Sequence, residues 1–396
     1  MIKKICILIL LVNSFIQVGA IEVNNYLNGV SLIIQGEYKV ADSVLTEAIR
    51  LKDFDITKLY YQRGISRYNQ EKFSHAYQDF MKAAETQHMA NLWLAKSAAI
   101  LHRETDVYFY LERYLRKKTD LNLKIVRQDE AFKLLTETNK WFDFWQNTWL
   151  SHEDDIILEA RYFVKKRRYE DAQRKLDILE PSVKKYKEMA LLFHAKGDFI
   201  NGMENINKAL SLESDNCDLI KIKIELLNSE SKKYQVIALL ERYLELKPED
   251  FEMQVLLMHK YYLNNNLNKA VAHSNVLEVL LPNNNEILEL SAEIEIANGE
   301  YLSAIKKLNN LISKGITSAH IYKLRGKAYY NTGTYSVAAL DFSNSLDIAP
   351  SDGETYYYYG MTNYMMDNKS KACYAFKKAY QNNYLRAMEE INTKCN

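Results

Sequence analysis

The sequence contains little proline and little glycine. Only four prolines and twelve glycines occur among 396 residues, which is too few for an all-β or loop-rich chain. An excess of charge of one sign is also missing, because 52 basic and 51 acidic side chains leave a formal net charge of +1. A near-neutral chain has no electrostatic footprint for nucleic acid, so we expect no nucleic-acid partner.

The sequence also lacks the motifs that carry catalysis. It has no P-loop, no Rossmann glycine fingerprint and no G-x-S-x-G elbow. Its eight histidines are scattered and form no H-E-x-x-H motif, and its four cysteines form no C-x-x-C pair. We therefore expect a protein that is not an enzyme and that holds neither a metal nor a cofactor.

The first twenty residues have the pattern of an export signal. Lys3 and Lys4 precede an apolar run from Ile5 to Val12, and the segment ends in small residues at Ala20. The apolar run would span only about 12 Å as a helix, against roughly 30 Å for the hydrocarbon core of a bilayer. This favours a cleaved signal peptide over a membrane anchor, and no later segment is apolar enough for stable membrane insertion. We expect a periplasmic or secreted protein.

A register of about 34 residues repeats along most of the chain. Its clearest copy runs from Ala319 to Asp352. The residues at slots 4, 8, 11, 15, 17, 20, 24 and 32 of this copy are Tyr322, Gly326, Tyr329, Gly333, Tyr335, Ala338, Phe342 and Pro350. Most of the glycines fall at slot 8 or slot 15, and most of the prolines fall at slot 32. This punctuation predicts two helices per repeat, with a turn at slot 15.

This register resembles the tetratricopeptide repeat (TPR) family. The resemblance implies an all-α fold, a right-handed superhelix (α-α solenoid) of about ten helix-turn-helix repeats. We call the two helices of each repeat helix A and helix B. The expected slot-1 residues are Glu22, Thr57, a degenerate third position near Ala90, Glu153, Val183, Cys217, Phe251, Asn285, Ala319 and Gly353.

The register also predicts the domain organisation. After the signal at 1–20, repeats 1–3 form an N-terminal block at 21–119 and repeats 4–10 form a C-terminal block at 153–383. An off-register helical connector at 120–152 separates the two blocks. Residues 384–396 are expected to form a capping helix that covers the last repeat.

Three tryptophans, Trp141, Trp145 and Trp149, are spaced by four residues in this connector, which places them along one helical face. One interpretation is that they fill an irregular core where the register breaks. The other is an exposed platform on which sugar rings stack.

The TPR resemblance implies that helix A lines a concave groove that binds ligands. The candidate groove residues are His259, Tyr262, Lys323, Lys327, Tyr330, Tyr357 and Tyr364. In one interpretation the charges form a ladder between neighbouring helices, pairing Glu289 with Lys323 and Glu293 with Lys327. In the other, which is compatible with it, lysines bind a peptide carboxylate and tyrosines hold apolar side chains. The carboxylate clamp of some TPR proteins is broken here, since slot 9 after Lys323 is Lys327.

The chain without its signal keeps three cysteines, Cys217, Cys373 and Cys395. A hairpin that turns near Asn382 would bring Cys373 close to Cys395, so a disulfide between them is expected in an oxidising compartment. The alternative is two unpaired thiols.

Taken with the export signal, these features predict an exported TPR scaffold that binds a protein or peptide through its groove. The alternative function is an envelope protein that binds glycan or cell wall through exposed aromatic residues.

Overall fold

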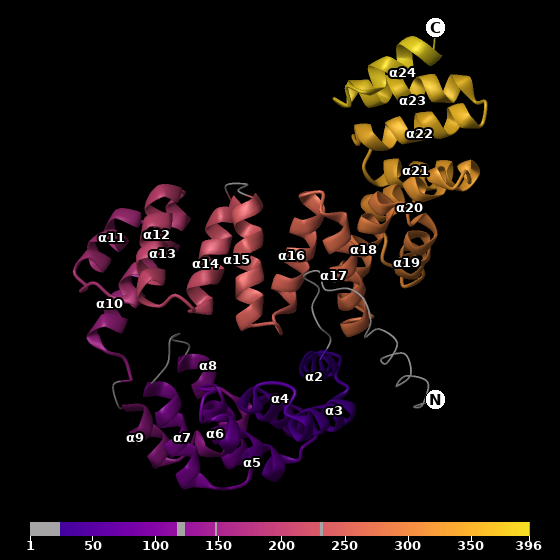
Figure 1. Cartoon of the computed structure of the whole chain (residues 1–396). Helices are drawn as coiled ribbons and strands as arrows, with labels where there is room; N and C mark the ends of the chain where they lie inside the picture. The colour runs from indigo at the N-terminus through magenta and orange to yellow at the C-terminus, as the bar shows by residue number, and fades with distance from the viewer. Residues whose placement is uncertain (1–23, 117–122, 147–148, 230–232, 396) are drawn as a thin grey trace. The chain divides into compact units, whose positions relative to one another are not determined.

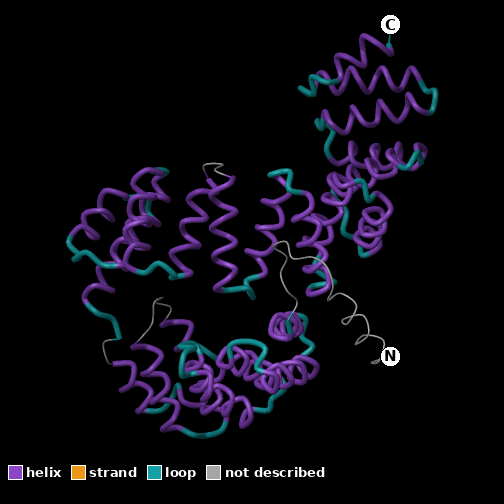
Figure 2. The backbone as a smooth tube through the Cα atoms, viewed as in Figure 1, coloured by secondary structure: helices purple, strands orange, loops and turns teal. Residues whose placement is uncertain are grey.

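The structure, a computed structural model, describes residues 24–116, 123–146, 149–229 and 233–395, so the expected export signal lies outside the described residues. Within this part of the chain all regular structure is helical, as predicted (Figure 2). None of the described helices is both long and apolar enough to cross a bilayer. The chain forms two compact units, of which the first ends at Met253 and the second begins at Gln254.

Helix pairs make up most of the first unit (Figure 1). Its N-terminal pairs are α2 (Asn25–Ile34) with α3 (Tyr38–Leu51), α4 (Ile56–Asn69) with α5 (Phe73–Ala83), and α6 (Ala90–Ile100) with α7 (Glu104–Arg116). The connector follows as α8 (Leu123–Arg127), the 3₁₀ helix η1 (Glu130–Leu135) and α9 (Asn139–Gln146). Three more pairs are α10 (His152–Lys165) with α11 (Tyr169–Asp177), α12 (Val183–Lys196) with α13 (Phe199–Leu212), and α14 (Cys217–Ser229) with α15 (Lys233–Leu246).

The second unit begins within α16 (Phe251–Leu263), which is followed by α17 (Leu267–Leu280). Its further pairs are α18 (Asn285–Asn298) with α19 (Tyr301–Ser313), α20 (Ala319–Asn331) with α21 (Tyr335–Ile348), and α22 (Gly353–Met365) with α23 (Lys369–Gln381). The last helix is α24 (Ala387–Lys394). The boundary between the two units therefore lies inside the seventh repeat, whereas the off-register connector lies within the first unit.

The predicted register agrees with the start of most helices A, whereas α2, α4 and α10 begin at Asn25, Ile56 and His152 and not at Glu22, Thr57 and Glu153. The helices α6, α12, α14, α16, α18, α20 and α22 each begin at the expected slot-1 residue. Side chains just before helix A satisfy its free backbone N–H groups, which fixes where the helix begins. Ser318, for example, accepts a hydrogen bond from the Ile321 N–H, and Asp352 accepts one from Thr355 N–H.

Slots 15 and 20 have separate physical roles. Slot 15 takes the left-handed backbone conformation whether it holds glycine, as at Gly197 (φ 79°), or a side chain, as at Arg167 (φ 57°). The basic run that contains Arg167 is therefore a turn between two helices. At slot 20 a small side chain lets helix B approach helix A. The alanines at this slot are completely buried: Ala41, Ala76, Ala172, Ala270, Ala304, Ala338 and Ala372.

The connector is helical but does not continue the repeat pattern. Trp141 of α9 is only 1% exposed and packs against Phe132 of η1, with ring centroids 5.5 Å apart. Both belong to the hydrophobic core that α5, α6 and α7 share. Trp145 packs against this core and Trp149 is half-buried. Because Trp141 is buried, the three indoles do not form a flat platform open to solvent.

The predicted capping helix is present as α24, which lies beside α23 (Figure 1). Cys373 of α23 and Cys395, just after α24, form a disulfide with a Cα–Cα distance of 5.5 Å. Ala387 and Ile391 of α24 pack against the hydrophobic cluster around Phe376. The disulfide and this apolar contact together hold the cap on the last repeat.

Candidate functional site

Most of the candidate ligand residues lie together on the helices A of the second unit. We call the following set the helix A row: His259 and Tyr262 of α16, Glu293 of α18, His320, Lys323, Lys327 and Tyr330 of α20, and Glu354 and Tyr358 of α22. The row crosses four neighbouring helices A, and side chains from each helix contact side chains of the next. All are half-buried, so they remain partly open to solvent.

Glu293 lies at the centre of one half of this row. Its carboxylate accepts a hydrogen bond from the Tyr262 hydroxyl at 3.4 Å and lies 3.5 Å from His320 Nε2. The hydrogen bond with His320 lowers the pKa of Glu293, and the same contact raises the pKa of His320. Burial and the neighbouring Glu293 charge raise the pKa of Tyr262 to about 12. By contrast, burial lowers the pKa of His259, which lies near the same carboxylate.

The two lysines occupy the other half of the row, and both are already paired. Lys323 Nζ lies 3.1 Å from carboxylate oxygens of Asp352 and of Glu354, and Lys327 Nζ lies 2.9 Å from Glu354. Burial alone would raise the pKa of Glu354, but the hydrogen bonds and charges of both lysines bring it below its ordinary value. Lys327 also lies over the ring of Tyr358, 4.9 Å from its centroid.

These pairs differ from the predicted ladder. The sequence led us to pair Glu289 with Lys323 and Glu293 with Lys327, but both lysines turn instead toward the following repeat. The reason is that Asp352, which caps α22, and Glu354, in its first turn, offer carboxylates that also interact with the free N–H groups there. A slot-by-slot comparison of N-caps would have indicated Asp352 as a partner.

Tyr357 does not belong to the accessible face, contrary to the prediction. It is only 4% exposed, and its hydroxyl donates a hydrogen bond to Glu390 of α24 at 3.2 Å. The physical cause is the cap, because α24 covers the position that a following helix A would otherwise occupy. Tyr364, near the end of α22, is 41% exposed and has the Lys394 ammonium 5.2 Å from its ring centroid. Tyr330 is half-buried with its ring edge against Tyr358.

The described residues contain no group of three or more histidine, cysteine, aspartate or glutamate side chains placed to hold a metal ion. The chemistry that the row offers is recognition, through ion pairs, one histidine–carboxylate contact and tyrosine rings.

The row also completes the repeat pattern. Its members come from slots 2, 5, 6, 9 and 12 of successive helices A, and each slot points to the same face. Together with the helix starts, the left-handed turns at slot 15 and the buried alanines at slot 20, this identifies the fold. The chain has the helix-turn-helix repeat fold of tetratricopeptide repeat proteins.

No protein-family model and no curated protein matches the sequence. Solved structures of similar fold do exist. A TPR protein from Parabacteroides merdae is 17% identical over 62% of this chain and 99% of its own, with a TM-score of 0.47. A chain of the Cut9–Hcn1 hetero-tetramer of the APC/C is 11% identical over 94% of this chain and 83% of its own, with a TM-score of 0.48. PilW, a type IV pilus biogenesis factor, is 12% identical over 53% of this chain and 98% of its own, with a TM-score of 0.45.

Proposed function

We propose that this TPR protein is an exported scaffold that binds a peptide or protein segment along the helix A row. The observation that carries the proposal is the continuity of the contacts. Glu293 joins α16 to α20, and the lysines of α20 join that helix to Glu354 and Tyr358 of α22. Side chains held in this way lose little further freedom when a ligand binds, which favours affinity.

The charges of the row indicate which groups contact the ligand. Lys323 and Lys327 are already neutralised by Asp352 and Glu354, so a ligand carboxylate would have to displace an existing ion pair. A ligand side chain that packs against a tyrosine ring displaces no ion pair. Tyr330 and Tyr364 offer large, stiff surfaces of the kind that dominates binding energy at protein interfaces. The ligand is therefore expected to contribute apolar or aromatic side chains to these rings.

The experiment replaces Tyr330 and Tyr364 together by alanine. The ligand is a partner captured by the unaltered protein from its native source, identified by mass spectrometry and then purified. Binding is measured by isothermal titration calorimetry. Loss of a tyrosine hot spot typically costs about 2 kcal/mol, a drop of about thirtyfold in affinity.

The matched control is Tyr374→Ala with Tyr380→Ala. These tyrosines are exposed on α23, the helix B of the last repeat, whereas Tyr330 and Tyr364 lie on helices A. The control pair is expected to bind as tightly as the unaltered protein. The proposal is wrong if the control pair loses affinity while the Tyr330 and Tyr364 pair keeps it.

Export is the second part of the proposal. It is supported by the basic and apolar start of the chain and by the Cys373–Cys395 disulfide, because disulfides persist mainly in oxidising compartments. Mass spectrometry of the protein from fractionated native cells should find an N-terminus at Ile21 in the periplasmic or secreted fraction. An intact Met1 in the cytoplasmic fraction would contradict export without affecting the binding proposal.

A further inference from the structure

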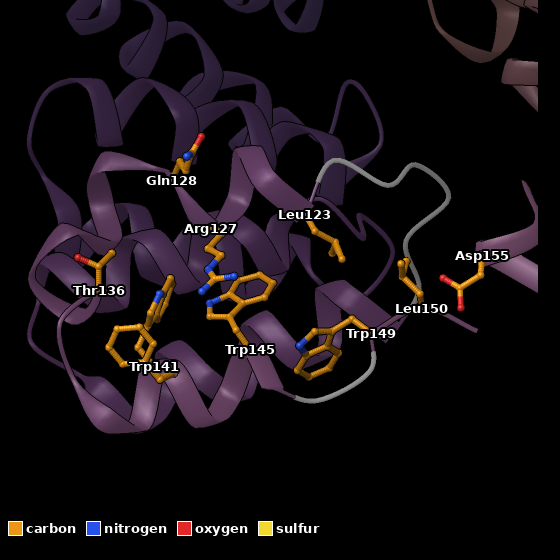
Figure 3. Close-up of a pocket in the computed structure, with 10 residues that line it drawn as sticks. Leu123, Arg127, Gln128, Thr136, Trp141, Trp145, Trp149, Leu150 and Asp155 are labelled. Carbon is orange, nitrogen blue, oxygen red and sulfur yellow. The ribbon is translucent and has the colours of Figure 1, made fainter. Parts of the chain in front are cut away.

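A pocket of about 620 Å³ lies in the first unit, in the connector between α7 and α10. One wall is aromatic and is formed by Trp141, Trp145 and Trp149 (Figure 3). Leu123 and Arg127 of α8 line it as well. The repeat pattern does not require this pocket, since it occurs only where the register is broken, and the helix A row does not include any of its residues.

Ring contacts and a hydrogen bond hold the aromatic wall in place before any ligand arrives. The Trp141 and Trp145 rings meet edge to face with centroids 5.7 Å apart, and Trp141 itself is anchored in the core. The Trp149 indole N–H donates a hydrogen bond to the Phe144 carbonyl at 3.1 Å, which fixes the orientation of that ring. The wall is therefore preorganised to receive an apolar side chain.

One charged donor next to this wall has no carboxylate partner among the described residues. The Arg127 guanidinium lies over the Trp145 ring, 5.9 Å from its centroid, and no carboxylate within the described part of the chain comes within ion-pair distance of it. Figure 3 shows the Arg127 guanidinium beside the Trp145 indole. A guanidinium presents two parallel N–H donors, which match the two oxygens of a carboxylate.

The opposite rim has the opposite charge. Asp155, in the first turns of α10, lines the pocket there and is exposed. An anion would be repelled at that end, so a charged ligand is oriented with its negative group at Arg127.

We propose that this pocket binds the C-terminal carboxylate of a peptide whose last side chain is apolar. The carboxylate meets the Arg127 guanidinium, and the apolar side chain packs among the tryptophans, Leu123 and Leu150. A sugar acid carries the same anion, but sugar recognition relies on an open aromatic face. Trp141 is buried, and Leu123 and Leu150 line the pocket beside the tryptophans. Both features favour an apolar side chain over a sugar ring.

Intrinsic fluorescence tests the proposal directly, because three of the four tryptophans of the chain line the pocket. The probes are an N-acetylated tripeptide ending in leucine with a free carboxylate, the same peptide as its C-terminal amide, and a disaccharide that contains glucuronic acid. The free acid is expected to change the tryptophan emission saturably. The amide and the sugar acid are each expected to bind at least tenfold more weakly.

Variants then locate the carboxylate. Arg127→Gln is expected to weaken binding of the free acid at least tenfold. Arg113→Gln is the matched control, because Arg113 lies over the Phe109 ring at 5.6 Å but does not line the pocket. Circular dichroism verifies the folding of each variant.

Three results would overturn the proposal: equal binding of acid and amide, preference for the sugar acid, or equal affinity of the Arg127→Gln and Arg113→Gln proteins. If Arg127→Gln does not fold, the comparison of the free acid with the amide on the unaltered protein still shows whether the carboxylate is bound.

Discussion

Gly326 of α20 lies so close to Phe342 of α21 that a Cβ atom on the glycine would come within 2.7 Å of the phenylalanine ring. The same two slots hold the pairs Gly64–Phe80 and Gly360–Phe376, each with a corresponding distance of 2.6 Å. Where slot 8 is alanine, slot 24 is smaller, and the buried pairs are Ala160–Leu176, Ala190–Ile206 and Ala292–Leu308. In these six repeats a larger side chain at slot 24 accompanies a smaller one at slot 8. The pairs Gly29–Leu45 and Ile224–Leu240 at the same slots do not follow this trend.

This relationship predicts the effect of Gly326→Ala. Alanine favours a helix over glycine by about 1 kcal/mol, but overpacking a close-packed core costs typically 1–3 kcal/mol. We expect a net loss of about 1 kcal/mol in the free energy of unfolding, measured by urea denaturation. The double variant Gly326→Ala with Phe342→Leu reproduces the Ala292–Leu308 pair and should recover that loss. A single variant that is more stable than the unaltered protein would contradict the volume argument.

A second prediction concerns a buried ion pair that the sequence did not reveal. The Arg325 guanidinium binds both carboxylate oxygens of Asp341 at 2.8 and 2.7 Å, and only 1% of the Asp341 side chain is exposed. Arg63 and Asp79 form the same pair in the second repeat, at the same slots. The pair thus belongs to the repeat and not to one local environment.

Asp341→Ala leaves the Arg325 charge without its partner in a largely buried site, which typically costs 3–5 kcal/mol. The double variant Arg325→Leu with Asp341→Leu should lose much less, because no charge stays unpaired. Glu47→Ala is the control, since its pair with Arg50 is solvent-exposed and its loss should not shift the urea midpoint. Equal destabilisation by the single and double variants would show that the pair contributes packing and not charge compensation.

The fold could be predicted well from the sequence because one local requirement determines the residue type at each repeat slot. Glycine, alanine and proline are chosen by backbone geometry and close approach, and these constraints recur every repeat. For the same reason the helix starts from Val183 to Gly353 agree with the expected slot-1 residues. The site was predicted less well. Ion-pair partners depend on the rotamers of long side chains, so both lysines of α20 turned toward Asp352 and Glu354 and not toward α18.

Two further differences arise where the repeat pattern ends. Tyr357 occupies a slot that faces solvent or ligand in a continuing array, but here α24 covers it. The connector pocket could not be predicted either. The connector does not follow the repeat pattern, so the pattern does not indicate which of its tryptophans is buried. Trp141 entered the core and Trp145 and Trp149 did not, although all three share one helical spacing.

The disulfide of the cap gives a third prediction. Cys373 and Cys395 are separated by 22 residues, and closing a loop of this size in the unfolded chain corresponds to about 3 kcal/mol of stabilisation. Cys373→Ser with Cys395→Ser should therefore lower the thermal midpoint of the second unit, as should reduction with dithiothreitol. Cys217→Ser is the control because Cys217 is a free cysteine in the structure. An unchanged midpoint under reducing conditions would show that the cap does not depend on the disulfide.

The last prediction follows from His273 of α17, which is buried inside the second unit. It is only 2% exposed, and its ring lies edge-on to Tyr261, with centroids 5.9 Å apart. Burial lowers the pKa of His273 from 6.5 to about 4, although the main chain of Gln254 acts in the opposite direction. The imidazole is therefore neutral in the folded protein at any pH above about 4.

The sign of the pH dependence comes from the unfolded chain. Above pH 6.5 His273 is neutral in both states and adds no pH dependence. Between pH 6.5 and pH 4 the unfolded state binds a proton that the folded state does not, so the free energy of unfolding falls as the pH falls. One pKa unit corresponds to 1.36 kcal/mol, so the full loss is about 3 kcal/mol and is complete near pH 4.

Urea denaturation between pH 7.5 and pH 4 measures this loss, and His273→Leu separates it from the titration of carboxylates. The leucine variant should show a flatter decline between pH 6.5 and pH 4 than the unaltered protein. His75→Leu is the matched control, because His75 of α5 is exposed and its replacement should leave the decline unchanged. If His273→Leu and the unaltered protein lose stability in parallel, His273 is protonated in the folded state. The prediction that its buried imidazole is neutral would then be wrong. A decline that flattens only in His273→Leu would assign the acid sensitivity of the second unit to this one side chain.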